Sequence, residues 1–428
     1  MNMRSRFSAM VFSLTAVVAG SLVSCSEPPP PPPQETTPAL VHVRLGTDRL
    51  EDSLPSVLVG KNVGLITNHS GADRNGKSTI DILFGRTDMK LVALFAPEHG
   101  IRGELTGAVE NTTDSVTGLP VFSLHGETYQ PTDEMMKGVD ALVFDVQDVG
   151  VRQYTYPSTM AHGMQVAAAK KIPFVVLDRP DPVTGTIVEG NILDTTYSSN
   201  VGLYAEASRH GMTVGELAKM FNEAFGIGCD LTVVPMEGWT RDLWIDETDL
   251  PWKKPSPNLP TLEGVYNYPG TVFFEGTSLS EGRGTEKPFE YIGAPWLNSQ
   301  AIADSMNAMA LPGVRFEPLD YTFAADARKY PGELAHGVRF VITDREVYRP
   351  IAASILFMEM AKKLHPSDFT FRGRPAEGGQ PASFSLDRLT GTDKTRAAID
   401  DGTVRELLAA WEQDAARFAE FRKPYLLY

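Results

Sequence analysis

Carboxylates, arginines and tyrosines gather in three segments of this sequence, 97–104, 145–154 and 275–286. Together these side chains suit the cleavage of a glycosidic bond. Such a bond breaks when an acid protonates the leaving oxygen and a second group supports the positive charge at the anomeric carbon. Aromatic rings offer flat faces to sugar rings, and an arginine can hold a carboxylate through two parallel hydrogen bonds. The composition of the three segments therefore favours sugar chemistry.

Short apolar runs precede the polar segments and predict the strands that position them. The predicted strands are Val63–Thr67, Leu91–Phe95, Ala141–Phe144, Phe174–Leu177 and Leu231–Val234, and the predicted helices between them are Thr79–Phe84, Thr132–Gly138, Ser158–Lys171 and Thr213–Phe225. Near-continuous apolar strands alternating with amphipathic helices indicate an α/β fold with a mainly parallel sheet. Ligands of such sheets bind beyond the carboxyl ends of the strands, which is where the polar segments begin.

The second half of the chain has a different pattern of predicted elements. Trp252–Tyr268 and Gly270–Trp296 are predicted as long loops, and loops of this length usually carry function or are disordered. A strand at Val338–Thr343 and helices at Ile351–Leu364 and Thr403–Phe421 follow. We therefore predict an N-terminal α/β domain over 41–240 and a smaller C-terminal α+β domain with long loops over 241–428.

The first 24 residues predict a signal peptide that ends at a cysteine. Arg4 and Arg6 precede an apolar stretch, and Leu22-Val23-Ser24-Cys25 resembles a bacterial lipobox. The resemblance implies that Cys25 is the lipidated first residue of a mature chain of 428 − 24 = 404 residues. A proline-rich linker over 25–40 would then hold the protein off a membrane. The other reading is a plain signal peptide with a cysteine there by chance.

Ser26 after that cysteine favours the outer membrane, with the protein facing the periplasm, by analogy with sorting in Gram-negative bacteria. The second cysteine of the chain, Cys229, is expected to be a small buried apolar residue.

Charge and motif spacing exclude several other classes. The net charge of 39 − 54 = −15 argues against a nucleic-acid partner. The eight histidines lack metal-binding spacing and Gly-x-Ser-x-Gly is absent, so we expect no metal, no cofactor and no serine-hydrolase elbow. Gly71–Ser78 matches the P-loop pattern. However, Asp73 inside it would repel a triphosphate, and we interpret the segment as a polar turn before a surface helix.

Four blocks of the sequence indicate a protein family more specifically than the overall composition does. They are Phe95–Gly103, Phe144–Tyr156, Leu177–Pro180 and Phe274–Thr285. Together they resemble the exo-β-N-acetylmuramidase family, and the resemblance runs from about Gly60 to the end of the chain. It implies a Rossmann-like N-terminal domain, a smaller C-terminal domain and a cleft between them. It also implies release of terminal β-linked N-acetylmuramic acid from the non-reducing end of peptidoglycan fragments, a reaction of cell-wall recycling.

The resemblance and the positions of polar residues together define a candidate site. The family's proposed catalytic glutamate, in its P-E-H-G motif, corresponds to Glu98. The candidate catalytic residues are Glu98, Asp148 and Glu281, and the candidate substrate-binding residues are His99, Arg102, Asp145, Gln147, Arg152, Tyr154, Asn191, Glu275 and Arg283. We expect Glu98 to be the general acid and base. The partner that supports the anomeric carbon is Asp148, Glu281 or the acetamido group of the substrate.

Several alternatives stay open from the sequence. Arg102, Arg152 and Arg283 are candidates to pair with the lactyl carboxylate of muramic acid, or they form structural ion pairs. Trp252–Tyr268 and Gly293–Trp296 are long enough to close one side of the cleft, which predicts cleavage at chain ends. The competing function is a cell-wall-binding lipoprotein without turnover.

Overall fold

The computed structural model describes residues 10–11, 13, 39–98, 100–102, 111–376, 380 and 382–428. Cys25, most of the proline-rich linker and His99 lie outside the described residues. Leu40–Tyr428 form one compact unit. Among the described residues, no helix is both long enough and apolar enough to cross a membrane.

A seven-stranded sheet forms the N-terminal half, in the order β3-β4-β2-β1-β5-β6-β9. Its strands are β1 (Asn62–Thr67), β2 (Lys90–Ala96), β3 (Thr112–Thr113), β4 (Pro120–Ser123), β5 (Ala141–Asp145), β6 (Pro173–Leu177) and β9 (Asp230–Val234). All neighbouring strands are parallel except the short edge pair β3 and β4. The predicted mainly parallel sheet is confirmed, and all five predicted strands belong to it.

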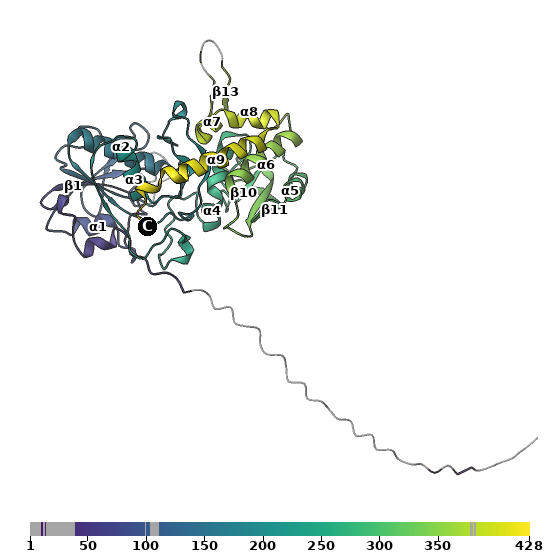
Figure 1. Ribbon diagram of the computed structural model, residues 1–428, viewed down its shortest axis with the longest axis horizontal. Coiled ribbons are helices and arrows are strands. Elements are labelled where there is room, and N and C mark those ends of the chain that lie inside the picture. Colours follow the sequence, from purple (N-terminus) through teal and green to yellow (C-terminus); the bar gives the residue numbers. More distant parts are fainter. Residues whose placement is uncertain are drawn as a thin grey trace, which may run out of the picture. The chain divides into compact units, whose positions relative to one another are not determined.

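Both faces of this sheet are buried, which explains the continuous apolar runs. Leu65, Val143 and Val175 face a core that includes Leu83 of α1 (Thr79–Phe84). Their chain neighbours face the opposite core, beneath α2 (Thr155–Lys170) and α3 (Val214–Glu223). Figure 1 shows α1 on one side of the sheet and α2 and α3 on the other.

The C-terminal half is built on a three-stranded antiparallel sheet in the order β10-β12-β11, as the predicted α+β unit requires. Its strands are β10 (Tyr291–Ala294), β11 (Val314–Thr322) and β12 (Leu334–Ile342). Its helices are α4 (Leu262–Thr271), α5 (Ser299–Ala308), α6 (Pro350–Leu364), α7 (Ser385–Thr390), α8 (Lys394–Asp401) and α9 (Val404–Phe421). Two short pairs complete the fold: β7 (Glu189–Ile192) with β8 (Ala207–Arg209), and β13 (Gly373–Arg374) with β14 (Ser383–Phe384).

The two halves share one core. The apolar cluster under α2 continues through Phe274, Phe340 and Phe357 to Trp411 of α9. After α9, the chain returns to the parallel sheet, where the Tyr428 hydroxyl donates to Oδ2 of Asp178 at 2.8 Å. The predicted boundary near residue 240 stays a prediction.

Three local expectations had different outcomes. Thr132–Gly138 is a series of turns and not a helix, because it is short and Gly138 ends it with a φ of +81°. Trp252–Tyr268 contains the first part of α4, so only its beginning is a loop. Cys229 is buried, as expected, and burial raises its thiol pKa to about 11.

Candidate active site

A polar cavity of about 190 Å³ lies where the order of the parallel strands changes direction. The loops after β2 and β5 contribute to it, and these strands flank β1 on either side. Such a switch point leaves a gap between loops that turn toward opposite faces of the sheet. The cavity is lined by Glu98, Gln153, Tyr154, Thr155, Tyr156, Val201, Ser256, Asn258, Leu259, Tyr268, Val272, Glu275, Arg283, Phe289, Arg328 and Leu389. Both halves of the chain therefore build its wall.

Glu98 reaches the cavity from the end of β2. Pro97 precedes it, and Gly100 follows with a φ of +73°, so the chain turns sharply just after the strand. The side chain is 33% exposed, and Nε2 of His125 lies 4.0 Å from Oε1. Among the described residues, no arginine or lysine is paired with this carboxylate. An acid that faces a cavity without a cationic partner can hold and give up a proton there.

Three tyrosines form one wall beside Glu98. The rings of Tyr154 and Tyr156 meet edge to face at 4.7 Å, and Tyr154 meets Tyr268 at 5.8 Å. Burial raises the pKa of both Tyr156 and Tyr268, and the charge of Glu98 raises each further. The Tyr156 hydroxyl donates to the carbonyl of Pro255 at 2.9 Å. The Tyr154 hydroxyl is buried and has no hydrogen-bond partner among the described residues.

Two acidic and two basic side chains form a charged cluster at the cavity. Nη1 of Arg283 contacts Oε1 of Glu275 and lies 3.2 Å from Oε1 of Glu281. Lys329 donates to Oε2 of Glu281 at 3.0 Å. Burial raises the pKa of Glu275. Burial acts the same way on Glu281, but the charges of Lys329 and Arg283 outweigh it and lower that pKa to about 2. Glu275 and Arg283 line the cavity, whereas Glu281 does not.

Asp148, predicted as catalytic, lies beneath the cavity and is 3% exposed. Its Oδ2 accepts from the backbone amide of Gly150 at 2.9 Å and lies 3.6 Å from Nε2 of His210. Burial lowers the pKa of His210, but the hydrogen bond and charge of Asp148 raise it above its usual value. Asp148 and Glu281 are therefore both placed outside the cavity lining.

The guanidinium groups of Arg102 and Arg152 form hydrogen bonds within the protein. Arg102 donates to both carboxylate oxygens of Asp114, from Nε at 2.7 Å and from Nη2 at 3.0 Å. Arg152 is 1% exposed and donates to the carbonyls of Glu206 and Thr390 at 2.9 and 3.0 Å. Burial lowers the pKa of Arg152 to about 10. Neither side chain lines the cavity.

Asp145 and Asn191 are buried side chains of the scaffold. Asp145 is fully buried and accepts from Thr47 at 2.7 Å and from Nη2 of Arg179 at 3.0 Å. Asn191 is 2% exposed, and its amide donates to the carbonyl of Ile192 at 3.2 Å. Like Asp148, both lie outside the cavity lining.

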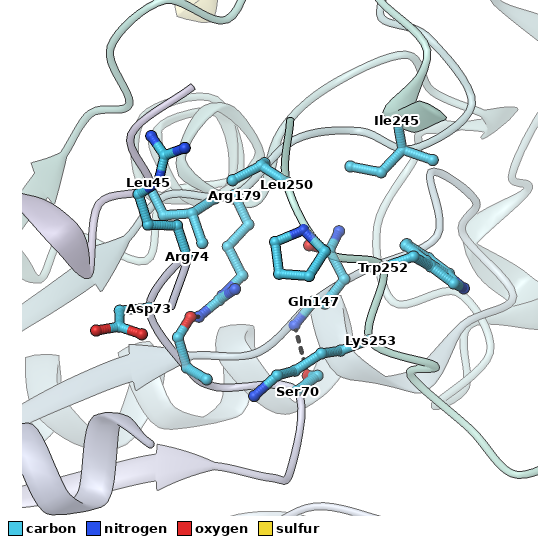
Figure 2. A pocket seen from close by; sticks show the side chains of 12 residues that line it. Leu45, Ser70, Asp73, Arg74, Gln147, Arg179, Ile245, Leu250, Trp252 and Lys253 are labelled. Atoms are coloured by element: carbon cyan, nitrogen blue, oxygen red, sulfur yellow. Dashed lines mark hydrogen bonds between the residues drawn. The ribbon is translucent and has the colours of Figure 1, made fainter. Parts of the chain in front are cut away.

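Gln147 lines a second, much smaller cavity (Figure 2). Its backbone amide donates to Oγ of Ser70 at 3.0 Å, and its side-chain amide donates to the carbonyl of Pro180 at 2.9 Å. Arg179 and Lys253 lie beside it in Figure 2. The cavity measures about 20 Å³, which is room for a single water and not for a sugar.

The P-loop-like segment is a tight turn. Oδ1 of Asp73 accepts from the backbone amides of Asn75 at 2.9 Å and Lys77 at 2.7 Å. A phosphate would need those amides free, so the carboxylate already occupies the place of the anion. The following helix, α1, has six residues and is capped by Ser78. The interpretation as a polar turn is confirmed.

Of the predicted site residues, the fold brings Glu98, Tyr154, Glu275 and Arg283 to one cavity. Sequence reasoning missed Tyr156, Tyr268 and Arg328, which also line it. Tyr156 lies two residues after Tyr154 in the same block, so its position was a usable signal. Among the described residues, no group of three or more His, Cys, Asp or Glu side chains is arranged to hold a metal ion.

The fold and cavity define a class: an α/β protein with a polar, tyrosine-lined cavity at the switch point of its parallel sheet. Matches to two family models assign the chain to a narrower group. The model for the N-terminal part of exo-β-N-acetylmuramidase NamZ matches residues 63–263, and the model for its C-terminal part matches residues 266–428. The chain belongs to the exo-β-N-acetylmuramidase NamZ family.

Individual relatives agree with this assignment. The chain is 44% identical over 389 residues to the peptidoglycan β-N-acetylmuramidase NamZ of Bacillus subtilis, covering 90% of this chain and 91% of that protein. Two crystal structures of DUF1343 family proteins from Bacteroides fragilis have the same fold. One has a TM-score of 0.81 at 34% identity and the other 0.71 at 33%, covering 91% and 90% of this chain and 99% of each of theirs.

Proposed function

We propose that this protein is an exo-acting glycoside hydrolase that releases terminal β-linked N-acetylmuramic acid from the non-reducing end of peptidoglycan-derived saccharides. The observation that carries the proposal is Glu98. In a chain of the NamZ family, it is a carboxylate that faces a polar cavity with no arginine or lysine paired to it among the described residues.

The reaction needs an acid and a group that supports the anomeric carbon. Glu98 donates its proton to the glycosidic oxygen as the bond from that oxygen to C1 breaks, and the leaving sugar departs with a free hydroxyl. The acetamido oxygen of the substrate closes on C1. Water then opens this intermediate and gives its proton back to Glu98. Asp148 and Glu281 lie outside the cavity lining and Glu275 contacts Arg283, which favours this substrate-assisted route.

Tyr154 is suited to hold the acetamido group. Its hydroxyl is buried beside the cavity and lacks a partner among the described residues. A hydrogen bond to the acetamide would fix the orientation that ring closure on C1 requires. Replacing Tyr154 with Phe should therefore lower kcat more than it raises KM.

Attack at chain ends follows from the size of the cavity. Its volume of about 190 Å³ is below the range of roughly 300–1,000 Å³ that is usual for larger ligand sites. Ser256, Asn258 and Leu259, from the loop before α4, close one side of it. Gly293–Trp296, which we also expected to close the cleft, does not line it, because Gly293 and Ala294 pair with β12.

The purified protein should release free N-acetylmuramic acid from the disaccharide muramyl-β-1,4-N-acetylglucosamine. Mass spectrometry of the products over time measures this release, and the glucosaminyl-muramic acid disaccharide is the control substrate. On long glycan strands, single units should appear while the mean strand length falls slowly. A rapid fall in strand length would mean cleavage within chains. Binding of the disaccharide without any product would instead favour a cell-wall-binding protein.

The N-terminal segment supports a proposal about location. We propose that Cys25 carries lipid and anchors the protein in the outer membrane, facing the periplasm, because it follows a lipobox-like sequence and Ser26 comes next. One acyl chain binds a membrane only marginally, so several chains are expected. In a Gram-negative host, Cys25→Ser should move the protein from the membrane to the periplasmic fraction, while the control Cys229→Ser stays with the membrane. A Cys25→Ser variant that remains with membranes would contradict the anchor.

A further inference from the structure

Four charged side chains line the polar cavity, and three of them have assigned partners or roles. They are Glu98, Glu275, Arg283 and Arg328. Glu98 is the proposed acid. Glu275 and Arg283 contact each other. Together with Glu281 and Lys329 they form a cluster in which two carboxylates face two cations. Arg328 is the remaining charge.

Arg283 is poorly placed to take a further anion. It already contacts the carboxylates of Glu275 and Glu281. A third carboxylate arriving there would leave the buried cluster with an excess negative charge, and it would be repelled by both acids at short range. Arg102 and Arg152 are bonded to Asp114 and to backbone carbonyls, and neither lines the cavity. The three arginines suggested by the sequence are thus all occupied.

Arg328 differs from these three arginines in its contacts. It lies in the connection between β11 and β12, and its side chain is exposed at the cavity. Within the described part of the chain, its guanidinium has no ion pair and no hydrogen bond, unlike those of Arg102, Arg152 and Arg283. An arginine with all its donors available can hold a carboxylate through two parallel hydrogen bonds.

The side chains of the two residues after Arg328 anchor its loop. Nζ of Lys329 donates to the carbonyls of Phe274 and Leu279 at 2.9 and 2.6 Å and to Oε2 of Glu281. The Tyr330 hydroxyl donates to the carbonyl of Ser278 at 2.6 Å. These contacts tie the loop that carries Arg328 to the segment that carries Glu275, which reduces the conformational cost of placing the guanidinium.

We propose that Arg328 is the residue that recognises the lactyl carboxylate of the terminal muramic acid and so distinguishes it from N-acetylglucosamine. The inference rests on the proposed function and deepens it. The two sugars differ by a lactyl ether that ends in a carboxylate, so a cation at the cavity can discriminate between them. This protein carries a net charge of −15, and a local unpaired cation favours the approach of an anionic ligand. Arg328 touches the substrate away from the reacting bond and is a specificity-determining residue.

The test measures the hydrolysis of 4-nitrophenyl β-glycosides of N-acetylmuramic acid and N-acetylglucosamine by the wild type, Arg328→Ala, Arg328→Lys and one control variant. A further glycoside carries the lactyl group as its methyl amide, which keeps the shape and removes the charge. Arg405→Ala is the control variant, because Arg405 is exposed on α9 and lines none of the cavities described above.

Arg328→Ala should raise KM for the muramic acid glycoside roughly ten- to hundredfold with little change in kcat, because a charge-assisted contact shared by ground and transition states is lost. Arg328→Lys should recover part of this loss. The amide and the N-acetylglucosamine glycoside should respond to neither variant. The wild-type KM for the muramic acid glycoside should rise with salt, and that of Arg328→Ala should not.

The outcomes separate the two proposals. A wild type that cleaves none of the muramic acid substrates would overturn the proposed function itself. A wild type that cleaves them, with Arg328→Ala matching it on all substrates, would overturn only the role of Arg328. An equal loss for the charged and amide glycosides would also overturn it, because that pattern reflects a change in cavity shape and not the loss of a carboxylate contact.

Discussion

Replacing Glu98 with Gln tests the chemistry directly. The variant keeps the size of the side chain and removes the proton that the glycosidic oxygen needs. Loss of a general acid typically lowers the rate ~10²–10⁴-fold, which corresponds to about 2.7–5.4 kcal/mol of transition-state stabilisation. We expect kcat for muramyl-β-1,4-N-acetylglucosamine to fall by this factor.

The same replacement should hardly affect stability. The Glu98 side chain is one-third exposed, and among the described residues its only ion-pair partner is His125, at 4.0 Å. Partly exposed pairs of this kind contribute about 0–1 kcal/mol. A change of this size shifts Tm by no more than about 4 °C in a protein of this length. A large loss of activity with a small change in Tm would separate a catalytic role from a structural one.

The leaving group provides a second signature. A 4-nitrophenolate leaves with little help from an acid, whereas the hydroxyl of N-acetylglucosamine needs a proton. Glu98→Gln should therefore lose more activity on the disaccharide than on the 4-nitrophenyl glycoside. Glu134→Gln is the matched control, because Glu134 is exposed and does not line the cavity. A folded Glu98→Gln protein that keeps more than about a tenth of wild-type kcat on the disaccharide would refute the assignment.

Two further predictions concern groups behind the site. The hydrogen bonds from Arg102 lower the pKa of Asp114 to about 2, so this contact stabilises the fold at neutral pH and is lost as pH falls toward 2. Arg102→Ala should cost about 1–3 kcal/mol in urea unfolding without changing the preference for muramic acid; a reduced preference would give Arg102 a role in binding. Burial raises the pKa of Asp181 to about 6, above its unfolded value of about 3.9. Its contribution to stability is therefore complete below about pH 4 and is lost as pH rises through 6. Asp181→Asn should flatten Tm against pH over that window, and an unchanged profile would show that Asp181 is not the titrating group.

The α/β architecture could be read from the sequence because it depends on local patterns. Strands buried on both faces must be apolar throughout, and all five predicted strands are found in the sheet. The polar residues after β2 and β5 also marked the correct edge of the sheet, because parallel strands end on the same side. Glu98 and Tyr154 lie at that edge, and the catalytic role of Glu98 was expected from the resemblance to the family. The helix predicted over Thr132–Gly138 is not found, because the pattern is too short to specify a helix without tertiary packing.

The assignment of roles within the polar segments required the tertiary structure. Arg102 and Arg328 are the same residue type, yet Arg102 is paired with Asp114 and Arg328 faces the cavity without a partner among the described residues. Asp148 follows β5 as Tyr154 does, but its side chain is buried beside His210. Which charge is neutralised and which remains available depends on contacts between segments far apart in the chain. Spacing along the sequence carries no information about those contacts, because the folded backbone sets where each side chain points.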